Sequence, residues 1–514
     1  MGNNINWGSI YKKTNFGKGV TNATNGWGSI YANLVSGISG ILSSLKSVGT
    51  YYENEEATEE TLNSLEKCKI LEKATILITP TSYGDGILHA AKPENGSADL
   101  DLVRGSAATR TNADGNVDSI DKLGVEINED VEFNTPSDWN LTGQSVVENG
   151  KAHILQSDSS NTGVTSNTKL INKKYLITGV ISDYVEGSVR FTSLGSTSSI
   201  ALPQENGTFS IEYTSTRSIA SDWNIQRLVS PVNLKLDNVS VKEVIDVTNI
   251  PRIDYTGGVG HILLEGQATQ LYENTETLST QDNTTTAQDY SVSFYGTGTV
   301  TLSGAYTGTL AGTGVNERVT LKFTSTAATL TSTVSGTVTK GQLEVGDASS
   351  YIPNTTGSAT RLAESLSRGG LSGLINSEEG VLYFKSSLVN DGEFGTPICV
   401  SVGNETNNFI LIYKTSSNLF RAIIRKEGVS YEIDSDVLAE GIYSVALSYE
   451  ENNCKLYVDG LIVGSLTTVE LPIGLNTLHC KVGSDINPYR GDIYTLGVFP
   501  TLTSTELQCL TTQS

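Results

Sequence analysis

Three acidic residues alternate near the end of a strand-like stretch of this 514-residue chain: Glu432, Asp434 and Asp436. In a β-strand, residues two positions apart lie on one face, so this spacing predicts neighbouring carboxylates. Retaining glycosidases use two carboxyl groups about 5–5.5 Å apart. Aromatic residues that would line a sugar cleft are missing nearby, apart from Tyr431. A solvent-facing strand end explains the same pattern, and we favour that interpretation.

Other catalytic patterns are absent from the sequence. It contains no Gly-x-Ser-x-Gly, no phosphate-binding loop and no His-Glu-x-x-His. The histidines are solitary, which leaves a zinc ion without a cluster of ligands; they are His89, His153, His261 and His479. We therefore predict that the protein is not an enzyme.

The cysteines are odd in number and far apart. They are Cys68, Cys399, Cys454, Cys480 and Cys509. No Cys-x-x-Cys pair occurs, and the spacing shows no disulfide framework. We expect free, buried thiols.

Composition and charge limit the class of protein. With 37% hydrophobic residues and 51 glycines, the chain favours many short strands with thin cores in about three to five domains. A net charge of −22 is repelled by nucleic-acid phosphates and by anionic membranes, so we expect no nucleic-acid partner. The sequence has no apolar run long enough to span a bilayer, so we expect no membrane insertion. It begins with polar residues, so we expect no signal peptide.

The first fifty residues repeat one aromatic phrase. Trp-Gly-Ser-Ile-Tyr occurs at 7–11 and again at 27–31. Large aromatic residues dominate protein interfaces because they bury much area at low entropic cost. We predict that Trp7, Tyr11, Trp27 and Tyr31 dock onto another protein. A small self-packed cap is the alternative.

An apolar seam follows this repeat. Its residues are spaced by four and three positions, the pattern of a heptad; they are Leu34, Ile38, Ile41, Leu45 and Val48. This spacing predicts a short helix that Gly37 and Gly40 weaken. An isolated helix of this length is barely stable, so we predict that copies from identical chains pack along the seam. A single helix lying on the next domain is the alternative. A second helix is predicted from Glu55 to Leu71.

Phrases spread along the chain resemble the appendage proteins, fibres or spikes, of tailed bacteriophages. They run from Leu71 to Gly115 (LEKATILITPTSYGDG…), from Asn249 to Ser279 (NIPRIDYTGGVGHILLEGQATQ…) and from Gln342 to Ser365 (QLEVGDASSYIPNTTGSATRLAES). This resemblance implies a virion protein made in the host cytoplasm. It also implies a homotrimer, anchored by its N-terminus to a portal, neck, capsid or tail protein, whose β-domains contact host surface glycans.

The segment 124–247 is predicted to be a jelly-roll. Its opening VEFNTPSDWN and closing VNLKLDNVSV resemble the first and last strands of galactose-binding-like carbohydrate modules. That resemblance implies a possible structural calcium ion at Glu132 and Asp237. A calcium ion needs six or more oxygens, so we favour two solvated carboxylates and no other cofactor. Trp139 and Trp223 are predicted as core residues rather than sugar platforms.

The remaining domain boundaries are placed where the spacing of apolar residues along the chain changes. We assign 1–50 to the anchoring segment and 51–123 to a connector of one helix and short strands. A further connector and a small β-sandwich with Thr and Ser outside occupy 248–365. In 366–514, the hairpin signal Asp459-Gly460 and the closing LTSTELQCL resemble the concanavalin A-like, laminin-G-type sandwich of phage fibres.

The sequence thus predicts a mainly β protein of serial antiparallel sandwich and jelly-roll domains, with a short N-terminal helical anchoring region. The expected function is attachment to host glycans, and the acidic surface favours neutral or cation-bridged glycans. The alternatives are a capsid or collar decoration protein without a ligand, a polysaccharide depolymerase built on Glu432, and a secreted adhesin.

Overall fold

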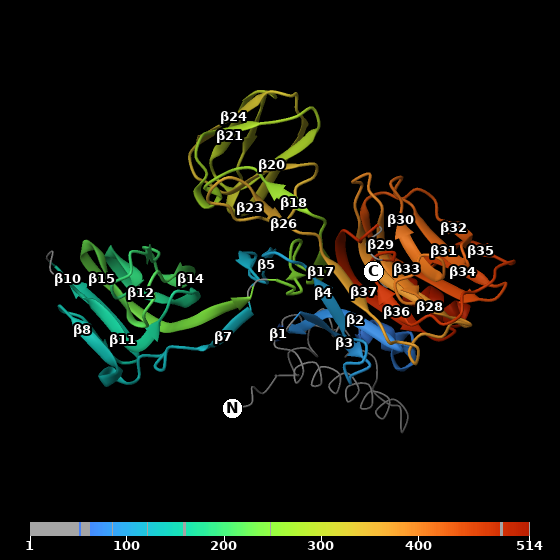
Figure 1. Ribbon diagram of the computed structural model, residues 1–514, viewed down its shortest axis with the longest axis horizontal. Coiled ribbons are helices and arrows are strands. Elements are labelled where there is room, and N and C mark those ends of the chain that lie inside the picture. Colours follow the sequence, from blue (N-terminus) through green and yellow to red (C-terminus); the bar gives the residue numbers. More distant parts are fainter. Residues whose placement is uncertain are drawn as a thin grey trace, which may run out of the picture. The chain divides into compact units, whose positions relative to one another are not determined.

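The computed structural model describes residues 51–52, 62–84, 86–120, 122–157, 161–246, 248–483 and 487–512 (Figure 1). These residues are mainly β and pair in antiparallel sheets, which confirms the predicted fold class. The predicted docking residues and seam lie outside the described residues: Trp7, Tyr11, Trp27, Tyr31, Leu34, Ile38, Ile41, Leu45 and Val48. No helix in the described ranges is long and apolar enough to cross a membrane.

Two compact units divide the chain. One comprises 105–109 and 119–250, and the other comprises 1–104, 110–118 and 251–514. A short hairpin of β5 (Thr109–Thr111) and β6 (Val117–Ser119) lies where the chain passes between them.

The smaller unit is a nine-stranded jelly-roll in the region predicted as 124–247. Its elements are β7 (Lys122–Glu126), η3 (Pro136–Asp138), β8 (Trp139–Thr142), β9 (Val146–Glu148), β10 (Lys151–Gln156), β11 (Gly163–Leu170), β12 (Lys174–Ser193), β13 (Ser199–Ala201), β14 (Gly207–Thr214) and β15 (Ser221–Asp246). The long strands β12 and β15 pair with each other through several register shifts. Gly187 (φ 78°) is required at one of them, because a Cβ there would lie 2.0 Å from the carbonyl oxygen of Pro231.

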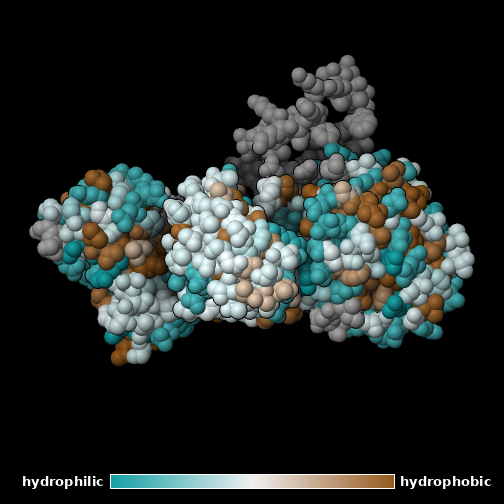
Figure 2. All heavy atoms as spheres, turned by 90° about the horizontal axis from the view of Figure 1, so that it is seen from above, coloured by the Kyte–Doolittle hydropathy of each residue, from teal (hydrophilic) through white to brown (hydrophobic). Residues whose placement is uncertain are grey.

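A small β-sandwich forms part of the larger unit. It contains β18 (Ala268–Gln270), η4 (Thr275–Thr277), β19 (Gln281–Thr284), β20 (Asp289–Gly296), β21 (Thr299–Gly304), β22 (Gly308–Ala311), β23 (Gly314–Thr324), β24 (Thr329–Ser335), β25 (Val338–Val345) and β26 (Ala359–Arg361). Val300 and Leu302 are buried while Thr301 and Ser303 are exposed, as the alternation predicts. Figure 2 shows this sandwich largely in the pale tones of intermediate hydropathy.

The C-terminal sandwich dominates the larger unit. Its later strands are β27 (Ser365–Arg368), β28 (Glu379–Leu388), β29 (Gly395–Ser401), β30 (Phe409–Lys414), β31 (Phe420–Lys426), β32 (Val429–Asp434), β33 (Gly441–Glu450), β34 (Cys454–Val458), β35 (Leu461–Leu466), β36 (Thr477–His479) and β37 (Gly491–Phe499). One layer follows the pairings β37–β28–β33–β34–β35, and the other follows β27–β36–β29–β30–β31–β32. The hairpin between β34 and β35 has positive φ at Asp459 (44°) and Gly460 (81°), as its sequence predicts.

Strands from much earlier in the chain complete this sandwich. They are β1 (Tyr51–Tyr52), β2 (Ile76–Gly84), β3 (Ile87–Lys92), β4 (Leu100–Val103), β16 (Ile253–Asp254) and β17 (His261–Leu264). The strand β2 pairs with β37, β17 pairs with another part of β37, and β4 pairs with β27. The segment predicted as a connector, 51–123, therefore supplies part of a sheet, because its apolar strands find partners hundreds of residues away.

A disulfide joins the two ends of the described chain. Residues 62–67 are α-helical, η2 (Leu71–Lys73) follows, and α4 (Ser504–Thr511) closes the chain with a Thr503–Glu506 capping box. Cys68 and Cys509 are bonded across a sequence separation of 441 residues. Our prediction that all cysteines are free was wrong for this pair, since no local spacing announces so distant a partner. Cys399, Cys454 and Cys480 are free and buried, as predicted.

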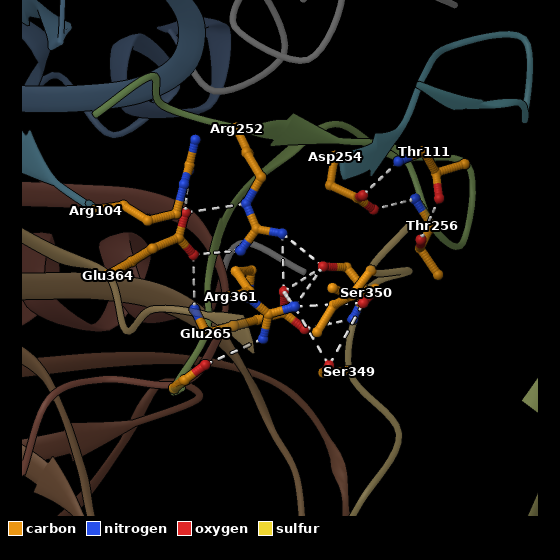
Figure 3. Close-up of polar contacts among 12 residues, drawn as sticks. Arg104, Thr111, Arg252, Asp254, Thr256, Glu265, Ser349, Ser350, Arg361 and Glu364 are labelled. Carbon is orange, nitrogen blue, oxygen red and sulfur yellow. Dashed lines mark hydrogen bonds and ion pairs between the residues drawn. The ribbon is translucent and has the colours of Figure 1, made fainter. Parts of the chain in front are cut away.

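Buried ion pairs connect the small sandwich to the C-terminal sandwich (Figure 3). Glu364 accepts hydrogen bonds from Arg104 (2.6 Å) and Arg252 (3.0 Å), and its side chain is fully buried. Glu265 pairs with Arg252 (2.8 Å) and Arg361 (3.0 Å). Burial alone would raise the pKa of Glu265, but Arg361 and Arg252 outweigh it and lower that pKa. The carboxylate therefore stays ionised and links Arg252, next to β16, to Arg361 in β26.

Candidate ligand-binding hollow of the C-terminal sandwich

The strands β30 and β31 present one face to the interior of the sandwich and one face outward. Ile410, Ile412 and Ile424 are fully buried on the inner face. The outer face follows from the register, which pairs Phe409 with Arg425, Leu411 with Ile423 and Tyr413 with Arg421. Because side chains alternate along a strand, these residues share one face that mixes aromatic, aliphatic and basic groups. Phe409 and Leu411 are buried at its base, and the other four are half-buried.

A hollow of about 190 Å³ lies in this outer face. It is lined by Thr406, Phe409, Leu411, Tyr413, Ile423, Arg425, Val482 and Asn487. Its floor is a hydrophobic cluster of Cys399, Phe409, Leu411 and Val482, against which Tyr413 and Ile423 pack. Its walls carry hydrogen-bonding groups, so the hollow combines an apolar base with a few polar contacts, as small-molecule sites do.

Aromatic rings gather at the side of the hollow that Tyr413 lines. Phe394, which is 43% exposed, stacks on Tyr413 with ring centroids 6.1 Å apart. Burial raises the pKa of Tyr413, while nearby Arg421 opposes this shift. The phenol of Tyr413 therefore stays neutral at physiological pH and can both donate and accept hydrogen bonds.

The acidic residues singled out for glycosidase chemistry are held by an arginine. Arg421 lies 2.8 Å from Glu432 Oε2 and donates from Nη2 to Asp434 Oδ2 at 2.7 Å. The hydrogen bond to Asp434 is the main cause that raises the pKa of Arg421. Glu432 and Asp434 share the predicted exposed face, and Asp436 lies exposed beyond the end of β32. The arrangement is that of a surface ion-pair cluster.

Sequence reasoning missed a buried serine–histidine pair next to the hollow. His479 Nε2 lies 2.6 Å from Ser401 Oγ and 3.2 Å from the carbonyl oxygen of Gly403. Both side chains are buried, and burial lowers the pKa of His479. His479 Nδ1 has no hydrogen-bond partner among the described residues, so no third group orients the ring as in a catalytic triad. The two residues are 78 positions apart, and no sequence pattern announces them.

The proposed calcium ligands have separate protein partners. Glu132 is exposed and accepts from Asn134 Nδ2 at 2.9 Å, whereas Asp237 accepts from the N–H of Asn238 at 2.8 Å. In the described part of the chain, no three His, Cys, Asp or Glu side chains gather as a metal site. This pair of carboxylates does not fit the six or more oxygens that calcium requires.

Two other carboxylates tie the opening of the jelly-roll together. Glu126 accepts from the N–H groups of Val241 (2.8 Å) and Asn128 (2.9 Å), which joins β7 to the last strand. Asp130 accepts from the N–H of Thr135 (3.0 Å) and from Trp139 Nε1 (2.9 Å). Backbone and indole N–H donors thus engage both of these carboxylates.

The tryptophans of the jelly-roll are core residues, as predicted. Trp223 is fully buried and Trp139 is 5% exposed. Their rings meet edge to face at 5.6 Å, and Phe191 stacks on Trp223 at 5.1 Å. Neither ring is available as a platform for a sugar.

No family model matches this chain, and no curated protein matches it. Among solved structures, the chain is similar to the CBM40 of the Ruminococcus gnavus IT-sialidase (18% identity, TM-score 0.24, 26% of this chain and 83% of that chain). It is also similar to the NanB sialidase from Streptococcus pneumoniae (17%, 0.25, 28% and 26%) and to the binding domain of botulinum neurotoxin serotype D/C VPI 5993 (14%, 0.24, 29% and 40%). At this level the likeness concerns parts of the β fold.

Proposed function

We propose that this protein is a fibre or spike protein of a tailed bacteriophage that contacts host surface glycans through its β-domains. The observation that carries the proposal is the hollow over β30 and β31, where Tyr413 and Arg425 border an apolar floor that includes Phe409. The chain is proposed to bind sugars without cleaving them, since Arg421 engages both Glu432 and Asp434.

The chemistry of the hollow suits a sugar ring. A pyranose has apolar C–H faces and a polar rim, and the half-buried side chains of Ile423 and Tyr413 offer apolar surface for the C–H faces. Thr406 and Asn487 supply polar atoms for the rim of hydroxyl groups. Sites that enclose drug-sized ligands measure roughly 300–1,000 Å³. A hollow of about 190 Å³ is smaller, so we expect it to take a single residue of a glycan.

Attachment and multiplicity complete the proposal. The Trp-Gly-Ser-Ile-Tyr repeat is proposed to dock the chain onto a portal, neck, capsid or tail protein of the virion, and the apolar seam to join three copies. A single shallow site binds weakly. Several copies held on one particle raise the effective affinity by about 10²–10⁴-fold without any new contact.

The proposal is tested by removing one ring of the hollow. Tyr413→Ala in the full-length protein is expected to weaken binding to an array of host surface polysaccharides about tenfold, because it removes stacking and a hydrogen-bonding hydroxyl. Tyr306→Ala is the matched control, since Tyr306 is also half-buried and stacks on Phe323 at 4.5 Å in the small sandwich.

Unchanged binding by Tyr413→Ala would remove the hollow as the contact site. Host adsorption that is unaffected in particles carrying this variant would favour a decoration protein without a ligand. Release of reducing ends from the polysaccharide by the wild-type protein would show that it is a depolymerase.

A further inference from the structure

We propose that the hollow over β30 and β31 selects a sugar that carries a carboxylate, and that Arg425 binds this group. The inference rests on the proposed glycan-binding function of the same hollow and names its ligand class. It also departs from the expectation drawn from the net charge of −22, which favours neutral glycans.

Arg425 is held in place by neutral groups. Its guanidinium lies 5.0 Å from the centroid of the Phe409 ring. Nε donates to Ser430 Oγ at 2.8 Å, and Nη1 donates to the carbonyl oxygen of Thr406 at 3.2 Å. These contacts fix the plane of the guanidinium at the wall of the hollow without neutralising its charge.

The neighbouring arginine shows the contrast. Arg421 lies four residues earlier on the same strand and face, and both Glu432 and Asp434 neutralise it. In the described part of the chain, no carboxylate lies within ion-pair distance of Arg425. Glu432, the acidic residue across from Ile423 on β32, is engaged by Arg421 instead. A half-buried cation in a hollow thus keeps its charge for a ligand.

An incoming carboxylate is the group that matches this cation. The guanidinium is a planar fork whose N–H groups fit the two oxygens of a carboxylate, and charge-assisted hydrogen bonds are stronger than neutral ones. Leu411, Ile423 and Val482 would pack against the sugar ring that carries it. Hexuronic acids and nonulosonic acids combine a ring with a carboxylate in this way.

The net charge restricts the ligand further. A surface of −22 repels a polyanion, but exposed charges are screened over about 8 Å at physiological ionic strength. A contact at Arg425 acts at a few ångströms and is screened less. We therefore expect an isolated acidic sugar, at a branch or chain end, to bind better than a densely charged polymer.

The test compares each acidic sugar with its own carboxyl-reduced form. The full-length protein is titrated calorimetrically with methyl glycosides of glucuronic, galacturonic and N-acetylneuraminic acid and with their reduced counterparts. At least one acidic glycoside is expected to bind about tenfold more tightly than its reduced form. Arg425→Gln is expected to abolish this preference, and Arg425→Lys to keep only part of it.

A control variant removes the same charge elsewhere. Lys455 lies on β34 in the other layer of the sandwich, and Lys455→Gln is expected to keep the full preference for the acidic glycoside. Thermal unfolding of each variant shows whether it folds. The comparison of acidic with carboxyl-reduced glycosides uses the wild-type protein and does not depend on any variant. Equal binding of acidic and reduced glycosides would overturn the inference.

The two proposals fail differently. If neutral glycosides bind in a manner that Tyr413→Ala abolishes, and the carboxylate adds nothing, the proposed function stands and the acidic ligand is wrong. If none of the glycosides binds the wild-type protein, both proposals are overturned. Loss of preference in Lys455→Gln as well as in Arg425→Gln would assign the effect to net charge and overturn the role of Arg425.

Discussion

At the scale of single residues, two buried histidines of the larger unit show opposite electrostatics. His261 Nε2 lies 3.1 Å from Asp492 and 3.5 Å from Asp254, and Nδ1 lies 2.9 Å from the carbonyl oxygen of Val259. Burial alone would lower the pKa of His261, but the hydrogen bond and charge of Asp492 outweigh it, so that pKa is raised. Burial lowers the pKa of His479, with a further contribution from Lys481.

These shifts predict opposite pH dependences. The raised pKa of His261 means that its stabilisation is complete below the unfolded value near 6.5 and is lost as the pH rises through the folded pKa. For His479, the folded state resists protonation, so stability is lost as the pH falls below about 6.5. Each group changes the free energy of unfolding by at most about 1.4 kcal/mol per pH unit.

The measurement is urea unfolding of the larger unit from pH 5 to 8. Compared with wild type, His261→Gln is expected to lose most stability at the acidic end, and His479→Gln to flatten the decline below pH 6.5. Each variant serves as the control for the other, because both lie in the same sandwich. Parallel stability curves for both variants would contradict the assignment.

At the scale of elements, the disulfide between Cys68 and Cys509 links the helical residues 62–67 to α4. Both cysteines adjoin one hydrophobic cluster that includes Leu65, Leu71, Leu507 and Leu510. A cross-link that closes a loop of this length lowers the entropy of the unfolded chain. Packing and cross-link together keep the two ends of the described chain on one sandwich.

Reduction of this disulfide is expected to lower the free energy of unfolding by about 2–4 kcal/mol. Cys509→Ser should show the same loss without reductant and no further loss with it. Cys454→Ser is the control, because Cys454 is a buried free thiol and its variant should keep the full response to reductant. Thermal melts with and without dithiothreitol measure the difference. An identical wild-type melting temperature in both buffers would count against a stabilising cross-link.

At the scale of the whole molecule, the two units use the chain differently. The jelly-roll takes its strands almost entirely from one continuous stretch, 119–250. The C-terminal sandwich takes β2, β3, β4, β16 and β17 from outside the stretch 366–514. Without them, β37 and β27 would expose unpaired backbone groups at their edges, and such edges promote aggregation.

Two fragments test this difference. A fragment of residues 119–250 is expected to unfold cooperatively in urea, whereas 366–514 should be unfolded or aggregated on its own. Co-expression of 62–104 and 251–265 with 366–514 should increase its soluble yield. Far-UV circular dichroism and size-exclusion chromatography report the outcome. A monomeric, cooperatively folded 366–514 fragment would show that the added strands are dispensable.

The sequence by itself determined the local features, which depend on residues close together in the chain. Alternating apolar residues made strands, Asp459-Gly460 made a hairpin, Thr503 and Glu506 capped the last helix, and Trp139 and Trp223 went to the core. These features depend on backbone sterics, hydrogen bonds a few residues apart and the burial of apolar surface, so a short window of sequence contains their cause.

Only the tertiary structure decided which distant residues meet. It paired β2 with β37, bonded Cys68 to Cys509, and gave Arg421 its carboxylates while leaving Arg425 beside Phe409 in the hollow. Two arginines four positions apart on one strand look alike in sequence because their partners lie on other strands. Their chemistry differs because strand register, which is set by contacts along the whole sheet, places Asp434 across from Arg421 and Ser430 across from Arg425.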